Sequence, residues 1–296
     1  MKYLIYVLLL IFSASCKNSN DSAAFQAPYN ALHALKSPVE FANGRITTTN
    51  GISFSKYGDV LYISNSIDKT FENGRRYAGI FKYTYKNNKW NGPELVQFGR
   101  IIDAYHPVLS IDNETLFFNS RSSLDSLNKS IPHNIWFAKK TASGWSAPKM
   151  LEGINSAHYD SYPSIAKNNN MYFNSDREGG KGGMDIYVSN YVNGEYQEPI
   201  NLKTLNSDQT ENDLVVDPEE KFIIFNRYID SIKALDLYIS YREGEDWGKP
   251  RALDKINSPK KWELTPSLSP EGKYFFYELD GKIMQIDLAE LVHIEK

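Results

Sequence analysis

Cysteine is nearly absent from this sequence, since the 296 residues contain only Cys16. A single cysteine excludes a disulfide framework within the chain. A surplus of basic charge is also missing, because 33 Lys and Arg stand against 36 Asp and Glu. Without a basic surplus there is no electrostatic footprint for a polyanion. We therefore expect no nucleic-acid partner.

The sequence lacks the short motifs that mark common catalytic sites. It contains no Gly-x-Ser-x-Gly elbow, His-Glu-x-x-His pair, dinucleotide-binding Gly-x-Gly-x-x-Gly or phosphate-loop Gly-Lys-Ser/Thr. The glycine-rich run Gly179–Gly183 joins two expected strands and opens no helix, so it lacks the amides of a helix N-terminus. We interpret this run as a flexible hairpin tip. For the whole chain we predict no cofactor apart from a divalent cation at the acidic positions described below.

Aromatic residues are abundant, with 20 Tyr, 15 Phe and 5 Trp. Aromatic side chains suit the pleated, half-buried surface of a β-sheet. The hydrophobic fraction of 41% is enough for a sizeable core in a chain of this length. Composition therefore favours an all-β protein.

The N-terminus has the pattern of an export signal. Lys2 supplies a positive charge, Tyr3–Phe12 is apolar but too short for a permanent membrane span, and Ser13–Ser15 supplies small residues before Cys16. This pattern resembles a bacterial lipobox, although Ser13 stands where Leu is commonest. We predict a signal peptide at residues 1–15 and a lipid on Cys16, the alternative being an ordinary signal peptide beside an unrelated cysteine.

The polar residues that follow, Lys17–Ala24, contain too little apolar area to fold and are typical of a flexible tether. We assign residues 16–33 to the lipidated cysteine and tether, and residues 34–296 to one folded domain. The expected location is the bacterial cell envelope, lipid-anchored, at the outer membrane on its periplasmic or surface side.

A repeat of about 50 residues dominates the rest of the chain. An aromatic residue stands three positions before a proline in Trp90–Pro93, Trp145–Pro148, Tyr196–Pro199 and Trp247–Pro250. These prolines are 55, 51 and 51 residues apart. Ahead of each lie three shorter landmarks: a strand of small residues, an apolar-aromatic strand after a turn, and an alternating run. The apolar-aromatic strands are Leu61–Ser64, Leu116–Asn119, Met171–Asn174, Ile223–Asn226 and Tyr274–Tyr277.

Four antiparallel strands in each of five repeats predict a five-bladed β-propeller. The last repeat ends at its third strand, Ile283–Leu288, while Pro38–Phe41 matches the fourth-strand landmark at the other end of the chain. We predict that this N-terminal strand completes the final blade, because closure removes unpaired sheet edges. The alternative is an open stack of meanders or a sandwich.

Two segments resemble the WD-like propeller repeat of TolB: Phe173–Tyr187, and the turn Ser269–Lys273 with the sequence Ser-Pro-Glu-Gly-Lys. The resemblance covers about residues 38–290. The repeat is especially similar to versions found in envelope proteins that carry a peptidoglycan-binding OmpA-like domain. It implies a propeller fold, whereas propellers host unrelated activities. TolB has six blades behind a separate α/β domain, so its partners are not implied here.

Acidic residues recur just before the innermost strand of four repeats, namely Asp103, Asp160, Glu211 and Glu263. In a propeller these positions converge at one mouth of the central channel, where His106 and His158 also lie. One hypothesis is an acidic rim that binds a cation, a cationic ligand or a sugar. The alternative is architectural: each acid bonds backbone amides beside the pairs Asn155–Ser156, Asn206–Ser207 and Asn257–Ser258.

Arginines follow the second strand in three repeats, at Arg121, Arg177 and Arg227. They suggest a carboxylate-binding ring, or a brace that stacks on aromatic rings within each blade. Recurrence from one repeat to the next favours the brace.

Two functions are consistent with these observations. The first is a monomeric, non-catalytic propeller that presents a face to an envelope protein or glycan. The second is a carbohydrate-active hydrolase or lyase that uses paired carboxylates from among the four acids, as the resemblance to lyases and glycosidases with propeller folds implies.

Overall fold

The computed structural model describes residues 34–70, 74, 76–99, 103–122 and 130–293. The predicted signal peptide, Cys16 and the tether up to residue 33 lie outside the described residues. Within the described part of the chain, no helix is both long enough and apolar enough to cross a membrane.

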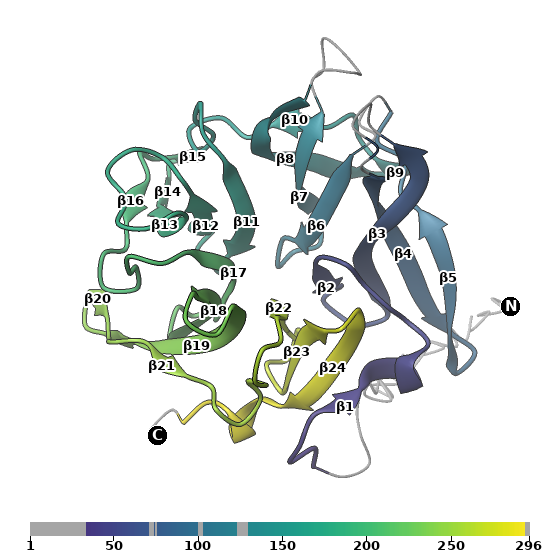
Figure 1. The fold of residues 1–296 in the computed structure, drawn as a ribbon. Coiled ribbons are helices and arrows are strands. Elements are labelled where there is room, and N and C mark those ends of the chain that lie inside the picture. Colours follow the sequence, from purple (N-terminus) through teal and green to yellow (C-terminus); the bar gives the residue numbers. More distant parts are fainter. Residues whose placement is uncertain (1–33, 71–73, 75, 100–102, 123–129, 294–296) are drawn as a thin grey trace, which may run out of the picture.

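Five small antiparallel sheets stand around a common axis, and this ring confirms the predicted five-bladed propeller (Figure 1). Blade 1 contains β2 (Ile52–Phe54), β3 (Val60–Thr70), β4 (Arg76–Lys86) and β5 (Lys89–Leu95). Blade 2 contains β6 (Ala104–Leu109), β7 (Thr115–Ser122), β8 (Ser130–Thr141), β9 (Gly144–Trp145) and β10 (Lys149–Met150).

The other three blades follow the same plan. Blade 3 contains β11 (Asp160–Ile165), β12 (Met171–Ser175), β13 (Asp185–Ser189) and β16 (Ile200–Asn201), with the hairpin β14 (Tyr191–Val192) and β15 (Glu195–Tyr196). Blade 4 contains β17 (Glu211–Val216), β18 (Phe222–Ile229), β19 (Ala234–Glu243), β20 (Asp246–Trp247) and β21 (Arg251–Ala252). Blade 5 contains β22 (Glu263–Leu268), β23 (Tyr274–Leu279), β24 (Lys282–Asp287) and β1 (Val39–Glu40).

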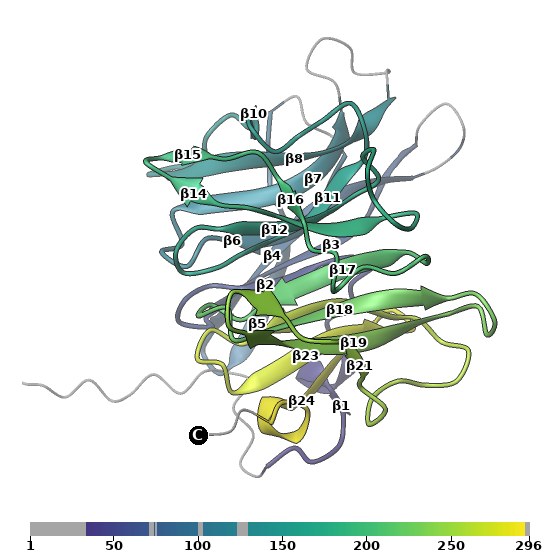
Figure 2. The same cartoon turned by 90° about the vertical axis from the view of Figure 1, so that its left-hand side faces the viewer.

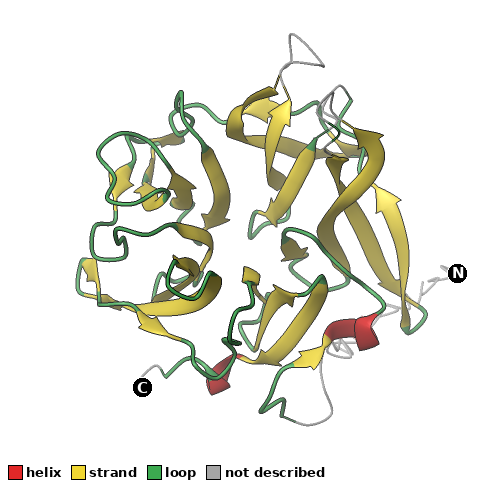
Figure 3. Cartoon of the chain, viewed as in Figure 1, coloured by secondary structure: helices red, strands yellow, loops and turns green. Residues whose placement is uncertain are grey.

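The N-terminal strand closes the ring as predicted. In the antiparallel pairing of β1 with β24, Val39 lies opposite Gln285 and Glu40 lies opposite Met284. Figure 3 shows the two ends of the described chain beside this sheet, next to the short 3₁₀ helices η1 (Phe41–Gly44) and η2 (Leu288–Glu290). Because β1 and β24 come from opposite ends of the described chain, their pairing closes the ring after the fifth blade.

The closing strand is shorter than the predicted segment Pro38–Phe41. The chain leaves the sheet at Phe41, because Ala42 and Asn43 adopt left-handed backbone angles with φ of 52° and 54°. The Phe41 side chain is only 2% exposed. Its ring contacts those of Phe54 and Phe276 edge to face, with centroids 5.8 and 5.7 Å apart. Phe41 therefore seals the junction between blades 5 and 1 by packing, with no strand pairing.

The described residues form a hydrophobic core of five clusters, one at each interface between neighbouring blades. Successive side chains of a strand point to opposite faces of the sheet. Phe117 accordingly packs toward blade 3, while its neighbour Phe118 packs toward blade 1. These interfaces hold together the stacked sheets seen in Figure 2. They form because alternate apolar residues of each second strand face the two neighbouring blades.

The aromatic residues three positions before each proline join one blade to the blade before it. Trp145 of blade 2 meets Tyr62 of blade 1 edge to face at 6.1 Å, and Trp247 of blade 4 meets Tyr172 of blade 3 at 6.0 Å. The two contacts differ in exposure: Trp247 is 2% exposed, whereas Trp145 is only half-buried. This difference leaves a hollow beside Trp145.

The glycine-rich run forms the loop between β12 and β13, as predicted, but it is packed and held by hydrogen bonds. The Asp185 carboxylate accepts hydrogen bonds from the backbone amides of Lys181 and Gly182 at 2.7 and 3.0 Å. A Cβ atom at Gly182 would lie 1.7 Å from the carbonyl oxygen of Gln209. Glycine is required at Gly182 for close approach of two backbones. The predicted position between two strands is confirmed, and the flexibility of the tip stays a prediction.

Candidate functional site

The innermost strands β2, β6, β11, β17 and β22 surround the axis of the ring (Figure 1). One residue near the start of each strand has left-handed backbone angles; it directly precedes β2 and is the third residue of each of the other four strands. These residues are Gly51, His106, Tyr162, Asp213 and Thr265, with φ of 87°, 51°, 53°, 29° and 50°. In the last four blades this residue falls in a β-bulge, and bulges re-aim side chains. We call these five residues the inner ring.

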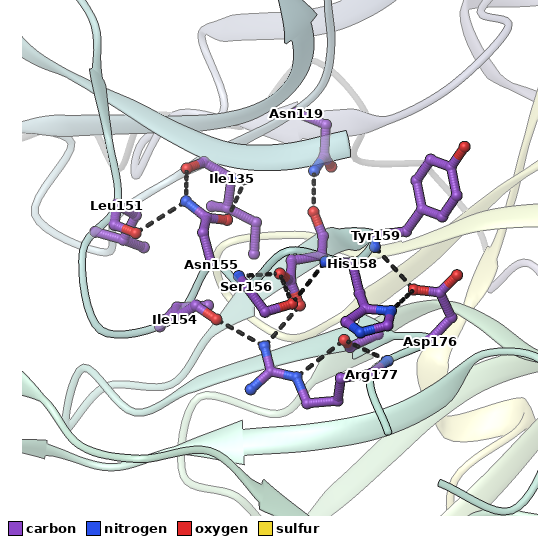
Figure 4. Close-up of polar contacts among 12 residues, drawn as sticks. Asn119, Ile135, Leu151, Ile154, Asn155, Ser156, His158, Tyr159, Asp176 and Arg177 are labelled. Carbon is purple, nitrogen blue, oxygen red and sulfur yellow. Dashed lines mark hydrogen bonds and ion pairs between the residues drawn. The ribbon is translucent and has the colours of Figure 1, made fainter. Parts of the chain in front are cut away.

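The carboxylate of Asp160 is held by a serine and an arginine of blade 3, an arrangement that we call the polar bracket. Figure 4 shows the two donor residues, Ser156 and Arg177. Asp160 Oδ2 accepts hydrogen bonds from the amide and hydroxyl of Ser156 at 2.5 and 2.8 Å. Its Oδ1 lies 2.6 Å from Nη2 of Arg177, which also donates to the carbonyl of Ile154 at 2.7 Å. The guanidinium also stacks 5.1 Å from the ring centroid of Phe173. The hydrogen bond from Arg177 to Asp160 joins two charged groups and is therefore stronger than a neutral one.

The same bracket recurs in blade 4. Glu211 accepts hydrogen bonds from the amide and hydroxyl of Ser207 at 3.1 and 2.5 Å, and Arg227 Nε donates to Glu211 Oε1 at 2.7 Å. Arg227 also donates to the carbonyl of Leu205 at 2.8 Å and lies 4.7 Å from the ring centroid of Tyr238. The arginine is thus a brace that joins a buried acid, a loop carbonyl and an aromatic ring.

In blade 2 the acid joins two blades. The guanidinium of Arg121 lies 2.7 Å from Asp103 Oδ2, while Asp103 Oδ1 accepts a hydrogen bond from the amide of Ala78 in blade 1 at 2.9 Å. Both ion-paired side chains are buried, at 0% exposure for Asp103 and 4% for Arg121. The predicted bracing role of the three arginines is confirmed.

Blade 5 keeps the acid but lacks the arginine. The partner of Glu263 across the strands is Leu279, at the position where Arg227 faces Glu211. Glu263 is 0% exposed, and its Oε1 accepts a hydrogen bond from the amide of Ser258 at 3.0 Å. Within the described chain its Oε2 has no hydrogen-bond partner. Burial raises the pKa of Glu263 to about 7, because a charged carboxylate without a counter-ion is costly in an apolar setting.

The Asn-Ser pairs before these acids form a second recurring device. Asn155 accepts a hydrogen bond from the amide of Ile135 at 2.8 Å and donates to its carbonyl at 2.8 Å (Figure 4). Asn206 makes the same two bonds to Ile186, at 2.7 and 3.0 Å. Asn257 repeats the pattern with Leu237. Each asparagine therefore fixes the connection between blades against the third strand.

The two histidines of the predicted set have different surroundings. His106 is buried in the inner ring, where its Nδ1 lies 3.1 Å from Asn50 Oδ1 and its ring meets Tyr162 edge to face at 5.1 Å. Burial lowers the pKa of His106 to about 3, so the imidazole is neutral at physiological pH. The His158 side chain is 41% exposed, with Nδ1 3.8 Å from Asp176 (Figure 4).

The structure distributes the predicted ligand-binding residues Asp103, His106, His158, Asp160, Glu211 and Glu263 over four blades. In the described part of the chain, no three side chains of His, Cys, Asp or Glu form a cluster that could hold a metal ion. The four acids are each 0% exposed. Ligand binding by this set stays a prediction, and the contacts of Asp103, Asp160 and Glu211 are architectural.

Three hollows of the described chain open at the end of the propeller opposite the four acids, which we call the turn face. It is formed by the turns between the first and second strands and by the hairpins after the third strands. The central cavity, about 220 Å³, is lined by all five innermost strands and reaches this face at Lys56, Lys167 and Pro270. Two grooves lie beside it, one on either side of blade 2.

The groove between blades 1 and 2 has a volume of about 540 Å³. Its walls carry aromatic residues and many hydrogen-bonding groups, namely Tyr57, Tyr62, Trp145, Asp59, Lys82, Glu94, Gln97, Asn113 and Lys140. Tyr57 is 64% exposed. The groove between blades 2 and 3 is larger, about 1010 Å³, and includes Phe137, Met150 and Tyr191. Sequence reasoning missed both grooves, because their aromatic residues look like the blade-packing landmarks.

No protein-family model matches this sequence, and no curated protein matches it. Solved structures match the fold. An endo-arabinase from Bacteroides thetaiotaomicron shares 10% identity over 89% of this chain and 99% of that chain, with a TM-score of 0.57. A TolB candidate from Agrobacterium tumefaciens shares 12% identity over 83% and 79%, with a TM-score of 0.53.

A gluconolactonase from Xanthomonas campestris shares 7% identity over 82% of this chain and 87% of that chain, with a TM-score of 0.50. The predicted likeness to the TolB propeller is therefore confirmed at the level of the fold. Identities this low establish the architecture alone, because propellers carry unrelated activities.

Proposed function

We propose that this chain is a non-catalytic binding module of the cell envelope, anchored at the outer membrane by a lipid on Cys16, and that its turn face recognises an envelope glycan. The lipobox-like N-terminus and the TolB-like fold support the location. A rigid ring that carries variable turns is a suitable scaffold for recognition.

The observation that carries this proposal is the state of the four candidate carboxylates. Glycoside hydrolysis needs two carboxyl groups that reach the scissile bond from opposite sides. Asp103, Asp160 and Glu211 are instead each buried against an arginine, and Glu263 is completely covered. A carboxylate held in this way is not available to a substrate, which favours binding over hydrolysis.

The groove between blades 1 and 2 has the chemistry that sugars require. The exposed ring of Tyr57 and the half-buried ring of Trp145 offer apolar faces for stacking on a pyranose. Asp59, Gln97 and Asn113 offer donors and acceptors for hydroxyl groups. Charges of both signs are present, so the groove suits a neutral or zwitterionic glycan better than a polyanion.

The test is to measure binding of purified protein to a panel of envelope polysaccharides, together with product formation. We expect binding without turnover, and loss of affinity by about tenfold or more in Tyr57→Ala. Tyr159→Ala is the matched control, because Tyr159 is 45% exposed in the connection that leads into β11, at the other end of the propeller.

Three results would contradict the proposal. Equal affinities for Tyr57→Ala and Tyr159→Ala would remove the groove as the binding site. Turnover that disappears in Glu263→Gln would instead identify a hydrolase or lyase. Crosslinking in cells to one envelope protein, without glycan binding, would assign the turn face to a protein partner.

A further inference from the structure

A recurring asparagine within the second strand links each of blades 2, 3 and 4 to the next blade. The side-chain amides of Asn119, Asn174 and Asn226 donate to the carbonyls of Asp160, Glu211 and Glu263, at 3.3, 2.9 and 3.4 Å. In strand register, Asn226 lies opposite Asn212, and Glu278 occupies the same position opposite Leu264 in blade 5. A carboxylate thus replaces the repeated amide in blade 5.

A second departure from the repeat lies beside the first. The inner ring carries neutral residues in every blade except blade 4, where the residue is Asp213. Asp213 is 4% exposed and Glu278 is 6% exposed. Electrostatic repulsion from Asp213 contributes, after burial, to raising the pKa of Glu278 to about 7. Among the described residues, neither carboxylate forms an ion pair with Lys, Arg or His.

The side chains around Asp213 have oxygen atoms that lack partners. Asp213 Oδ2 accepts hydrogen bonds from the amide of Thr265 at 3.0 Å and from Nδ2 of Asn226 at 3.3 Å. The remaining oxygens are Asp213 Oδ1, Thr265 Oγ1, Asn226 Oδ1 and Glu278 Oε2, all buried and without a hydrogen-bond partner in the described chain. Thr265 is 1% exposed and Asn226 is 0% exposed.

Four buried oxygens without donors are an energetic problem that a cation would solve. A buried polar atom without a partner costs about 1–3 kcal/mol, and a buried charge costs more. Water satisfies acceptors but leaves the negative charge of the ionised carboxylates uncompensated. A divalent cation favours the ionised form of both carboxyls, compensates their charge, and accepts every type of oxygen present, namely carboxylate, amide carbonyl and hydroxyl.

We propose that Asp213, Glu278, Thr265 and Asn226 bind a hard divalent cation of the calcium class at the interface of blades 4 and 5. The donor set contains only oxygen, with no imidazole or thiolate, so it does not favour zinc or copper. Calcium tolerates irregular coordination and mixed oxygen ligands, whereas magnesium requires a near-octahedral set. Bound in this way, the ion links the inner ring to the second strand of the next blade.

The test is to titrate the full chain, after treatment with chelator, with CaCl₂ and separately with MgCl₂, following heat of binding and melting temperature. We expect one calcium site per chain, tighter than for magnesium, and a melting temperature that rises with calcium concentration. Asp213→Asn and Glu278→Gln should each weaken calcium binding by about tenfold or more. Asp230→Asn is the control, because Asp230 is an exposed acid on the same blade.

Two variants keep the test decisive if one of them fails to fold. The proposal is overturned if the wild type shows neither heat nor a change in melting temperature up to about 10 mM calcium, a concentration at which even a weak site is occupied. It is also overturned if a folded Asp213→Asn or Glu278→Gln binds calcium as tightly as Asp230→Asn. In either case the two carboxyls share protons and hold no cation.

Discussion

Replacing the same acid in two blades should change stability in opposite directions. Glu211 and Glu263 occupy equivalent positions and both are 0% exposed. Glu211 is paired with Arg227 at 2.7 Å, while Glu263 faces Leu279. We predict that Glu211→Gln destabilises the fold and that Glu263→Gln stabilises it at alkaline pH.

The magnitudes follow from burial and pairing. Raising the pKa of Glu263 from 4.5 to about 7 weakens the folded state at pH 8 by about 3 kcal/mol. Glutamine removes this charge but buries an amide with one missing hydrogen bond, which costs about 1 kcal/mol. The expected net gain is about 2 kcal/mol. Glu211→Gln leaves Arg227 without its counter-ion, at a cost of about 3 kcal/mol or more.

The effect at Glu263 must depend on pH. Between the ordinary carboxyl pKa of 4.5 and the raised pKa of about 7, the folded state of the wild type binds more protons than the unfolded state. Its unfolding free energy therefore falls as pH rises through this window, and the penalty is complete above pH 7. Glu263→Gln escapes the penalty, so its advantage should nearly vanish at pH 5.

Urea unfolding followed by tryptophan fluorescence at pH 5 and pH 8 measures all three proteins. The reasoning is refuted if Glu263→Gln is destabilised to the same extent as Glu211→Gln at pH 8. It is also refuted if the difference between Glu263→Gln and the wild type is the same at both pH values.

Three further outcomes are expected from the same unfolding assay. Leu279→Arg should restore the missing brace, so a double-mutant cycle with Glu263→Gln should give a favourable coupling of about 1 kcal/mol or more, and zero coupling would contradict the bracket. Phe41→Ala should cost about 3–5 kcal/mol, because the ring fills the junction of blades 5 and 1; a cost below about 1 kcal/mol would show that closure does not depend on it. Gly182→Ala should cost about 2 kcal/mol, because its Cβ would clash with Gln209; an unchanged midpoint would mean that the loop yields.

The architecture was predictable because its determinants are local and repeated. The strand landmarks, the turn residues and the unmatched fourth strand at Pro38–Phe41 are all visible in the sequence. The partner of each acid was not, since Asp160 and Arg177 meet only when strand register and bulge place them together. Left-handed residues such as Tyr162 and Thr265 also carry no local signal, because neither type favours that conformation.

The grooves were missed for a different reason. Trp145 and Trp247 stand at the same position of the repeat, yet Trp247 is 2% exposed and Trp145 is half-buried beside a groove of about 540 Å³. The sequence pattern is equal at both sites. Whether the tryptophan ring is buried depends on how the neighbouring hairpin packs against it, and this packing is a tertiary contact that the local sequence does not specify.

Function in this propeller is best sought where the repeat is broken. A residue that recurs in successive blades performs work that each blade needs, as Arg177 and Arg227 do in bracing a buried acid. Glu278 and Asp213 replace neutral residues at two recurring positions, and the ring closes in the other blades without acids there. The architecture does not require these two acids, and burying their charge costs stability. A ligand that compensates the charge would remove this cost. The interface of blades 4 and 5 is therefore the place where a bound ion would act on the fold.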